Sequence, residues 1–234
     1  MFNNLKFAAT VGAALLLFGA GAKADLITNG GFETTTGYGQ IGTNATVSGW
    51  TTNGYNFIFP SSGGTVNGSA GSLSLYNGGV DGGAVLGPSP AGGNYIGADG
   101  AFEVGAISQT ITGLTAGTNY TVGFYWGGAQ QNGFTGITTE QWLVSLGNET
   151  LSTNVLTDAS HGFTGWQQTF LTFQATGSSE TLSFLAQGTP DGQPPFSLLD
   201  GVTMNAVPEP ASMSLLGAGL AALGFVRRRK QKQG

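Results

Sequence analysis

The single histidine of the chain lies in the segment Asp158-Ala159-Ser160-His161-Gly162, which brings together the residue types of a nucleophilic triad. A Ser-His-Asp triad normally gathers its members from separate elements, because the imidazole must bridge the hydroxyl and the carboxylate. Three residues so close in sequence form a polar turn instead. The sequence therefore predicts no catalytic role for His161.

Carboxylates are the other groups that could perform acid–base chemistry. A pair of Asp or Glu residues is sufficient for glycoside hydrolysis when the two groups flank the scissile bond. The available residues are Asp81, Asp99, Glu103 and Glu140. Nothing in their spacing selects a pair. We expect a protein that is not an enzyme and keep a glycoside hydrolase or lyase with a carboxylate-only site as an alternative.

Aromatic rings and amides could bind a glycan, because flat rings stack on sugar faces and amides hydrogen-bond to hydroxyls. The candidates for such a platform are Trp50, Tyr55, Tyr95, Trp126, Gln130 and Gln131. However, Trp126 and Trp142 lie on the apolar face of their predicted strands, and Trp50 and Trp166 lie where strands are expected to begin. Core packing is therefore the favoured role for these four tryptophans, and a lectin-like module stays an alternative.

Charge and cysteine content exclude several function classes. The seven Lys and Arg residues lie at Lys6, at Lys23 and from Arg227 onward, so residues 25–226 hold twelve carboxylates against His161 alone. Such a segment cannot neutralise phosphates, which excludes nucleic-acid binding. The chain has no cysteine, which excludes disulfides, zinc–thiolate sites and a cysteine nucleophile.

Apolar residues alternate with polar ones in several short runs, which is the pattern of half-buried strands. The clearest runs are Tyr120–Trp126, Trp142–Leu146, Gln167–Ala175 and Thr181–Ala186. No segment between residues 25 and 206 keeps a helical period. Several strands separated by Gly, Asn and Ser turns predict an all-β, antiparallel β-sandwich of the jelly-roll type. Residues 52–100 are rich in Gly, Ser and Asn, and we expect long loops there that join two or three strands.

Asp200 has the same strand parity as Val202 and Met204, so without a bulge its side chain points toward the core. A buried carboxylate needs a cation, hydrogen-bond donors or protonation. Because residues 25–226 contain no Lys or Arg, a metal would satisfy this need, and hard oxygen ligands favour calcium over zinc. The other interpretation is an exposed Asp200 in a closing turn.

Residues 1–24 have the features of a signal peptide. Lys6 lies in a short polar start, an apolar stretch follows from Phe7 to Ala20, and Ala22-Lys23-Ala24 precedes Asp25. The translocon and signal peptidase recognise a cationic start, an apolar middle and small residues before the cleavage point. We therefore expect export of the residues that follow.

The C-terminal end carries a second targeting signal. Pro208-Glu209-Pro210 is followed by an apolar segment, 211–226, and by the basic end 227–234, which begins with Arg227, Arg228 and Arg229. We expect residues 211–226 to form a short transmembrane helix with the basic end in the cytoplasm. This order resembles the PEP-CTERM sorting signal of Gram-negative bacteria. The resemblance implies recognition by an exosortase, a membrane-embedded cysteine transpeptidase, and an association with exopolysaccharide.

A second resemblance covers most of residues 25–206. The order of Asn29-Gly30-Gly31-Phe32-Glu33, Ser48-Gly49-Trp50, Ile107–Ile111, Leu114–Tyr120, Gly165-Trp166 and Leu198–Val202 is similar to galactose-binding-like jelly rolls, including carbohydrate-binding modules. In such modules a structural calcium often joins the first and last strands. The resemblance thus implies Glu33 and Asp200 as the calcium ligands, and the other interpretation is an exposed Glu33.

Together these features predict a signal peptide (1–24), a β-sandwich domain (25–206) and a PEP-CTERM tail (207–234). We expect an exported protein of the cell surface or extracellular matrix, held in the inner membrane by its tail until processing. Its expected partners are the translocon, signal peptidase, an exosortase and exopolysaccharide.

Overall fold

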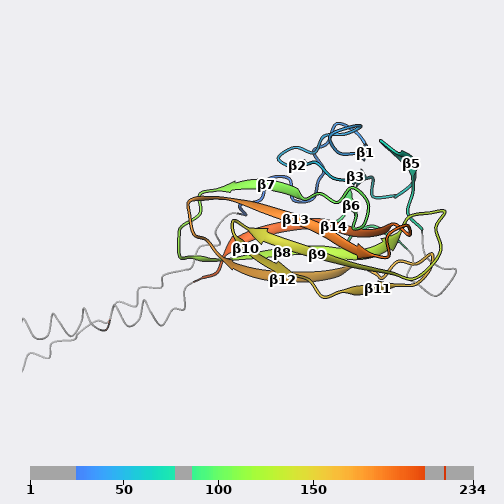
Figure 1. Ribbon diagram of the computed structural model, residues 1–234. Coiled ribbons are helices and arrows are strands. Elements are labelled where there is room, and N and C mark those ends of the chain that lie inside the picture. The colour runs from blue at the N-terminus through green and yellow to red at the C-terminus, as the bar shows by residue number, and fades with distance from the viewer. Residues whose placement is uncertain (1–24, 77–85, 209–218, 220–234) are drawn as a thin grey trace, which may run out of the picture.

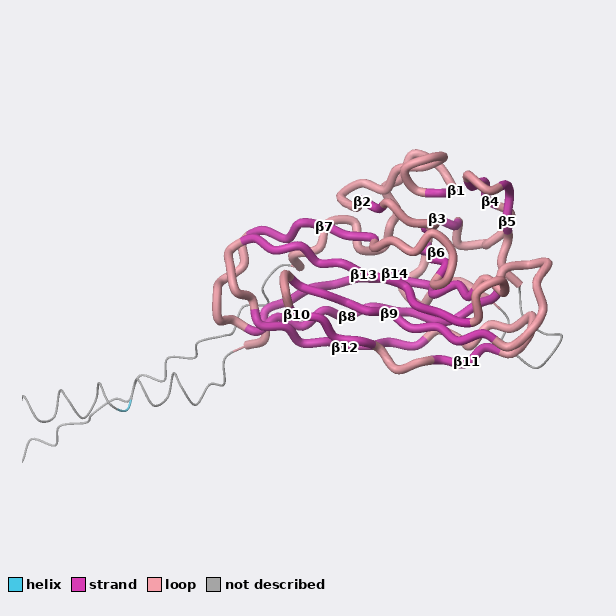
Figure 2. The backbone as a smooth tube through the Cα atoms, viewed as in Figure 1, coloured by secondary structure: helices cyan, strands magenta, loops and turns pink. Residues whose placement is uncertain are grey.

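The computed structural model describes residues 25–76, 86–208 and 219, and within them the chain folds into two antiparallel sheets that pack face to face (Figure 1). The tube view shows that the described residues consist almost entirely of strands and connecting loops (Figure 2). The predicted all-β antiparallel sandwich is confirmed.

The last strand of the domain lies in the middle of the first sheet, between strands that come much earlier in the chain. In spatial order this sheet consists of β1 (Gly39–Gln40), β3 (Asn56–Phe59), β6 (Tyr95–Asp99), β14 (Pro195–Ala206), β8 (Asn119–Gln130) and β12 (Gln167–Gln174). β14 pairs with β6 on one side and with β8 on the other. The fold therefore closes only when the C-terminal strand is in place.

The second sheet is built around β9 and β13. In spatial order it consists of β10 (Glu149–Ser152), β9 (Thr138–Leu146), β13 (Ser179–Thr189), β7 (Ile107–Thr112) and β2 (Thr51–Thr52), and β11 (Leu156–Asp158) also pairs with β9. A separate hairpin is formed by β4 (Val66–Gly68) and β5 (Gly71–Leu73).

The main core lies between the two sheets. The four runs predicted from alternation each send one apolar face into it, as shown by the buried side chains of Phe124, Trp126, Trp142, Phe173 and Phe184. Rings from both sheets meet there, because Phe124 of β8 and Phe184 of β13 pack edge to face at 5.1 Å. The period-two pattern thus identified the inner face of each long strand correctly.

A second apolar cluster covers the outer face of the first sheet. It contains the aromatic residues Tyr55, Phe57, Phe59, Tyr95 and Phe196. The segment expected to form loops with two or three strands holds β3, β4, β5 and β6, and its aromatic residues pack into this cluster. The β4–β5 hairpin contributes Val66 and Leu73. The first sheet is therefore buried on both faces over part of its area.

A β-bulge in β14 corrects the predicted orientation of Asp200. The register against β8 shifts between Asp200 and Thr203, and Gly201 adopts a left-handed φ of 59°. The extra residue reverses the alternation. Asp200 pairs with Tyr125 on the outer face of the first sheet, whereas Val202 and Met204 point into the main core.

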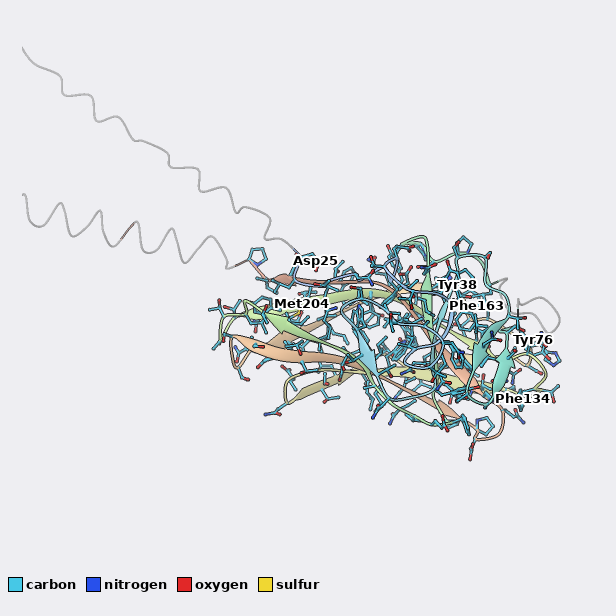
Figure 3. All side chains as sticks on the ribbon, turned by 90° about the horizontal axis from the view of Figure 1, so that it is seen from above. Asp25, Tyr38, Tyr76, Phe134, Phe163 and Met204 are labelled. Atoms are coloured by element: carbon cyan, nitrogen blue, oxygen red, sulfur yellow. The ribbon has the colours of Figure 1, made fainter. Side chains whose placement is uncertain are left out.

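The two ends of the domain lie side by side. Asp25 accepts a hydrogen bond from the backbone N–H of Met204 at 2.8 Å, and the N–H of Leu26 donates to the Met204 carbonyl at 3.1 Å. Figure 3 places Asp25 and Met204 at one end of the sandwich, with Tyr76 and Phe134 at the opposite end. We call these the terminal end and the distal end.

The predicted signal peptide, residues 1–24, lies outside the described residues. So does the predicted transmembrane helix 211–226, except for Gly219, which is helical. Among the residues that are described, no helix has the length and apolar character needed to cross a membrane.

Candidate functional site

A pocket of 290 Å³ is lined by loops that meet near the distal end of the sandwich. Its walls include the rings of Tyr55, Phe102 and Phe134 and the carboxylates of Asp99 and Asp191. The remaining lining residues are Ala70, Ser72, Leu73, Ala101, Gln131, Gly192 and Pro194. Its volume is at the lower end of the range of about 300–1,000 Å³ that is typical of small-molecule sites. The pocket thus combines an aromatic wall with a few polar groups.

Asp99 is the buried polar group of this pocket. It ends β6, is 2 % exposed, and its Oδ1 accepts hydrogen bonds from the N–H groups of Ala101 at 2.9 Å and Phe102 at 3.1 Å. Its Oδ2 has no hydrogen-bond partner. Burial raises the pKa of Asp99 to about 6, the two N–H donors lower it, and the Asp191 carboxylate raises it further. Asp99 therefore offers an unused acceptor that is ionised at neutral pH.

Tyr55 connects the pocket to the aromatic cluster beneath it. Its ring packs edge to face against Phe57 at 4.5 Å and against Phe102 at 5.1 Å. Burial raises the pKa of Tyr55, and the carboxylates of Asp99 and Glu103 raise it further, so the phenol stays protonated at neutral pH. Phe102 is 43 % exposed, which leaves part of its ring available to a ligand.

A second polar site joins Glu33 to Asp200. Asp200 is 0 % exposed, its Oδ1 accepts a hydrogen bond from the N–H of Gly201 at 2.6 Å, and its Oδ2 has no hydrogen-bond partner. Burial raises the pKa of Asp200 to about 7, the Ser89 hydroxyl and the Gly201 N–H lower it, and the carboxylate of Glu33 raises it. Glu33 is held in place by the N–H of Asn94, which donates to its Oε1 at 2.7 Å.

The donors around Asp200 suit a hard cation. The structure brings together the two carboxylates that the jelly-roll resemblance implied, and the hydroxyl of Ser89 adds a neutral oxygen. A Cβ at Gly31 would lie 4.0 Å from both Asp200 Oδ1 and Glu33 Cγ, so Gly31 borders the space between them. The described residues contain no cluster of three or more His, Asp or Glu side chains, so other ligands to a metal here would be neutral oxygens.

Two family models match this chain, one over the sandwich domain and one over the C-terminal tail. The model of the family described as "Protein of unknown function (DUF642)" matches residues 25–205, which is most of the sequence. The chain belongs to this family. The model of the PEP-CTERM protein-sorting motif matches residues 206–230 of this DUF642 protein, which confirms the resemblance identified from Pro208, Glu209, Pro210 and the basic end.

Several solved structures share the sandwich fold at low sequence identity. TmCBM61 in complex with β-1,4-galactotriose is 16 % identical, with coverage of 79 % of this chain and 100 % of that chain and a TM-score of 0.40. The CBM22-1 xylan-binding domain of Xyn10C from Paenibacillus barcinonensis is 15 % identical, with coverage of 82 % and 100 % and a TM-score of 0.38. A CBM4 structure is 16 % identical, with coverage of 77 % and 99 % and a TM-score of 0.36. No curated protein matches the sequence.

Most aromatic residues considered as sugar platforms are buried in the DUF642 domain. Trp50 is 4 % exposed, packs on Phe32, and donates its indole N–H to the Asn29 carbonyl at 3.1 Å. Trp126 is 0 % exposed, and Tyr95 lies in the outer-face cluster. These positions agree with the core-packing interpretation of Trp50 and Trp126. Of the six residues proposed as ligand contacts, Tyr55 and Gln131 line the pocket.

Gln130 connects the two loops at the distal end. Its amide donates to the Gly136 carbonyl at 3.1 Å, and its Oε1 accepts from the backbone N–H of His161 at 2.9 Å. The hydroxyl of Ser160 accepts from the Gly136 N–H at 3.0 Å, and the His161 ring packs against Tyr76. Gln130 is 0 % exposed, so it supports the loops rather than facing a ligand.

Sequence reasoning did not select Phe102, Phe134 or Asp191 as pocket residues. Phe102 and Phe134 belong to Gly100-Ala101-Phe102 and Gly133-Phe134-Thr135-Gly136. A large aromatic residue in a Gly-rich turn has no strand face on which to be buried, and this signal could have identified both. Asp191 gave no such signal, because a lone Asp beside a Pro is ordinary in a turn.

Proposed function

We propose that this DUF642 protein is an exported, PEP-CTERM-sorted surface protein whose sandwich binds a neutral glycan in the distal pocket without cleaving it. The observation that carries the proposal is the pocket itself, whose wall combines the exposed ring of Phe102 with the carboxylates of Asp99 and Asp191. The sorting motif, matched at residues 206–230, accounts for delivery to the cell surface and for exosortase processing.

The chemistry of the pocket favours sugar over other ligand classes. The C–H faces of a pyranose would pack on Phe102 and Phe134, while Asp99 and Asp191 accept hydrogen bonds from hydroxyl groups. Lys and Arg are absent from residues 25–226, so the site has no means of neutralising an anionic polysaccharide. Two carboxylates in its wall would repel one. The expected partner is therefore a neutral stretch of exopolysaccharide.

Glycan-array binding of the full chain, purified in detergent and followed by calorimetry on the glycans that bind, tests this proposal. Phe102→Ala is expected to abolish binding, because it removes an exposed ring from the pocket. Phe170→Ala is the matched control: Phe170 is 61 % exposed on β12 and lies outside the pocket. Equal binding by the two variants, or no binding by the wild-type protein, would overturn the proposal.

A carboxylate-only hydrolase is the competing interpretation of the same pocket, since Asp99 and Asp191 both line it. The bound glycan should be incubated with the wild-type protein and with Asp99→Asn, and the release of reducing ends should be followed. We expect no release from either protein. Release that disappears in Asp99→Asn would identify an enzyme. Glu140, considered earlier for such a pair, is 0 % exposed and does not line the pocket.

We further propose that Glu33 and Asp200 hold one structural calcium ion. The ion would supply the positive charge that the buried Asp200 lacks, and it would connect the first segment of the domain to β14. Asp200→Asn is expected to lower the calcium content by one ion per chain and to reduce the fall in melting temperature on chelation. Glu149→Gln, at an exposed carboxylate of β10, should change neither quantity. Unchanged calcium content in Asp200→Asn would exclude this site.

A further inference from the structure

A second pair of buried carboxylates lies within the main body of the sandwich, apart from the pocket and from Asp200. Glu140 of β9 is 0 % exposed, and Asp158 at the end of β11 is 1 % exposed. β11 pairs with β9 so that Asp158 is directly opposite Thr138. Because Thr138 and Glu140 are two residues apart on one strand, all three side chains lie on the same face of the sheet.

Four polar atoms of this group make no well-formed hydrogen bond, although the Thr138 hydroxyl lies close enough to Glu140 to lower its pKa. Both carboxylate oxygens of Glu140, Oδ2 of Asp158 and the hydroxyl of Thr138 are buried without a hydrogen-bond partner. Thr138 is itself 0 % exposed, so its hydroxyl is shielded from bulk solvent. Unpartnered buried oxygens are rare in native proteins, and each is expected to have an explanation.

Two glycines make room for the carboxylates. A Cβ at Gly128, on β8 of the opposite sheet, would lie 2.4 Å from Oε2 of Glu140. A Cβ at Gly162 would lie 2.4 Å from Oδ1 of Asp158. The backbone N–H and carbonyl of Gly128 are both occupied by Thr164, so this close approach supplies Glu140 with space but with no donor.

The charge of the pair must be balanced by a proton or by a cation. Burial raises the pKa of Glu140 to about 8, the Thr138 hydroxyl lowers it, and the Asp158 carboxylate raises it. Burial raises the pKa of Asp158 to about 7, and the Ala159 N–H lowers it. One proton shared between the carboxylates would join one oxygen of each, and the Thr138 hydroxyl would donate to the remaining Glu140 oxygen, but the pair would keep one negative charge in the interior. A divalent cation bound by these oxygens would neutralise both charges.

We propose that Thr138, Glu140 and Asp158 form a second calcium site, enclosed between β8 and β9. The donor set consists only of hard oxygen atoms, which is the set that calcium prefers. Export would expose the site to the calcium outside the cell. Since β9 and β11 border the loops at 131–137 and 159–164, the ion would fix the base of the distal end. The site depends on neither glycan binding nor the Glu33–Asp200 site.

Calcium content of the full chain, stripped with chelator and reloaded with calcium alone, tests this site by mass spectrometry of the metal. Glu140→Gln, which preserves the side-chain shape, should lose one ion per chain relative to the wild-type protein. The loss should persist in the Asp200→Asn background, which separates the two sites. Glu149→Gln on β10 is the matched control and should retain the wild-type calcium content.

Because Glu140 is buried, Glu140→Gln could fail to fold, and a second variant then decides. Thr138→Val removes one neutral ligand without a change of charge and should raise the calcium dissociation constant while the far-ultraviolet circular dichroism is unchanged. Wild-type calcium content and affinity in a folded variant would overturn the proposal. The pair would then be a proton-sharing pair, and Glu140→Gln would raise the melting temperature in the presence of chelator.

Discussion

Asp99 illustrates, at the scale of a single residue, what a buried carboxylate does in a domain that has no Lys or Arg. Two backbone N–H groups satisfy Oδ1, whereas Oδ2 is buried in the pocket wall without a partner. Burial is the larger effect, so the pKa rises from 3.8 to about 6. The ionised form of Asp99 is therefore unfavourable for folding, and its Oδ2 remains an unpartnered acceptor in the pocket wall.

Asp99→Asn is expected to stabilise the free protein at pH 8 and to weaken glycan binding. Asp99 has a higher pKa in the folded than in the unfolded protein, so its protonated form stabilises the fold fully below the unfolded-state pKa, near pH 4. This stabilisation is lost as the pH rises through the folded-state pKa of about 6. At pH 8 the ionised Asp99 costs about 3 kcal/mol of unfolding free energy. The asparagine avoids this cost while its oxygen still accepts both N–H groups.

Urea unfolding of the wild-type protein and Asp99→Asn at pH 4 and pH 8 measures the effect. The variant should be more stable at pH 8 and nearly equal to the wild type at pH 4. A gain of the same size at both pH values would mean that ionisation of Asp99 is not its cause.

At the scale of elements, the bulge in β14 determines where the chemistry lies. Gly201 has a φ of 59°, and a Cβ there would lie 2.7 Å from the Cβ of Ala91 and 3.1 Å from the ring of Tyr125. The glycine therefore allows both the backbone conformation of the bulge and the close approach of the loop that carries Ser89. Without the bulge, Asp200 would point into the main core, away from Glu33.

Gly201→Ala should destabilise the domain more than Gly113→Ala does. Both glycines have left-handed backbones, so an alanine costs about 1 kcal/mol at either position. Around Gly113, nothing lies within 4 Å of an added Cβ, whereas around Gly201 the methyl group of Ala91 must move. Chemical denaturation of both variants isolates the packing cost. Equal losses of stability would show that the loop carrying Ala91 moves aside without a measurable cost.

The sequence was sufficient to predict the long strands but not the contacts between distant segments. Tyr120–Trp126 and Trp142–Leu146 lie within β8 and β9, because alternation is a local property of the chain. The orientation of Asp200 was predicted wrongly, since a bulge depends on one glycine conformation that alternation does not reveal. The Glu140–Asp158 pair depends on the register of β11 against β9, and it could not be read from spacing.

At the scale of the whole molecule, the chain termini and the pocket lie at opposite ends of the domain. The chain enters at Asp25 and leaves after β14 at the terminal end, where Asp25 and Met204 are hydrogen-bonded. Phe134, a pocket residue, lies at the distal end (Figure 3). A protein attached through its C-terminal tail would therefore present the pocket away from the surface to which it is attached. Because the two ends of the domain lie together, removal of the expected signal peptide and processing of the tail would act on adjacent parts of the folded domain.

Processing at both ends is the prediction that tests this arrangement in the native host. Fractionation and intact-mass measurement should find the product outside the cell, without residues 1–24 and without the segment that follows the Pro208-Glu209-Pro210 motif. Replacing these three motif residues by alanine should leave a full-length tail in the inner membrane, because the prolines hold the extended backbone that a peptidase cleft requires. Val207→Ala changes the residue before the motif and should be processed normally. An unclipped wild-type protein in the inner membrane would mean that the tail is a permanent anchor, and the distal pocket would then act at the outer face of that membrane rather than at the cell surface.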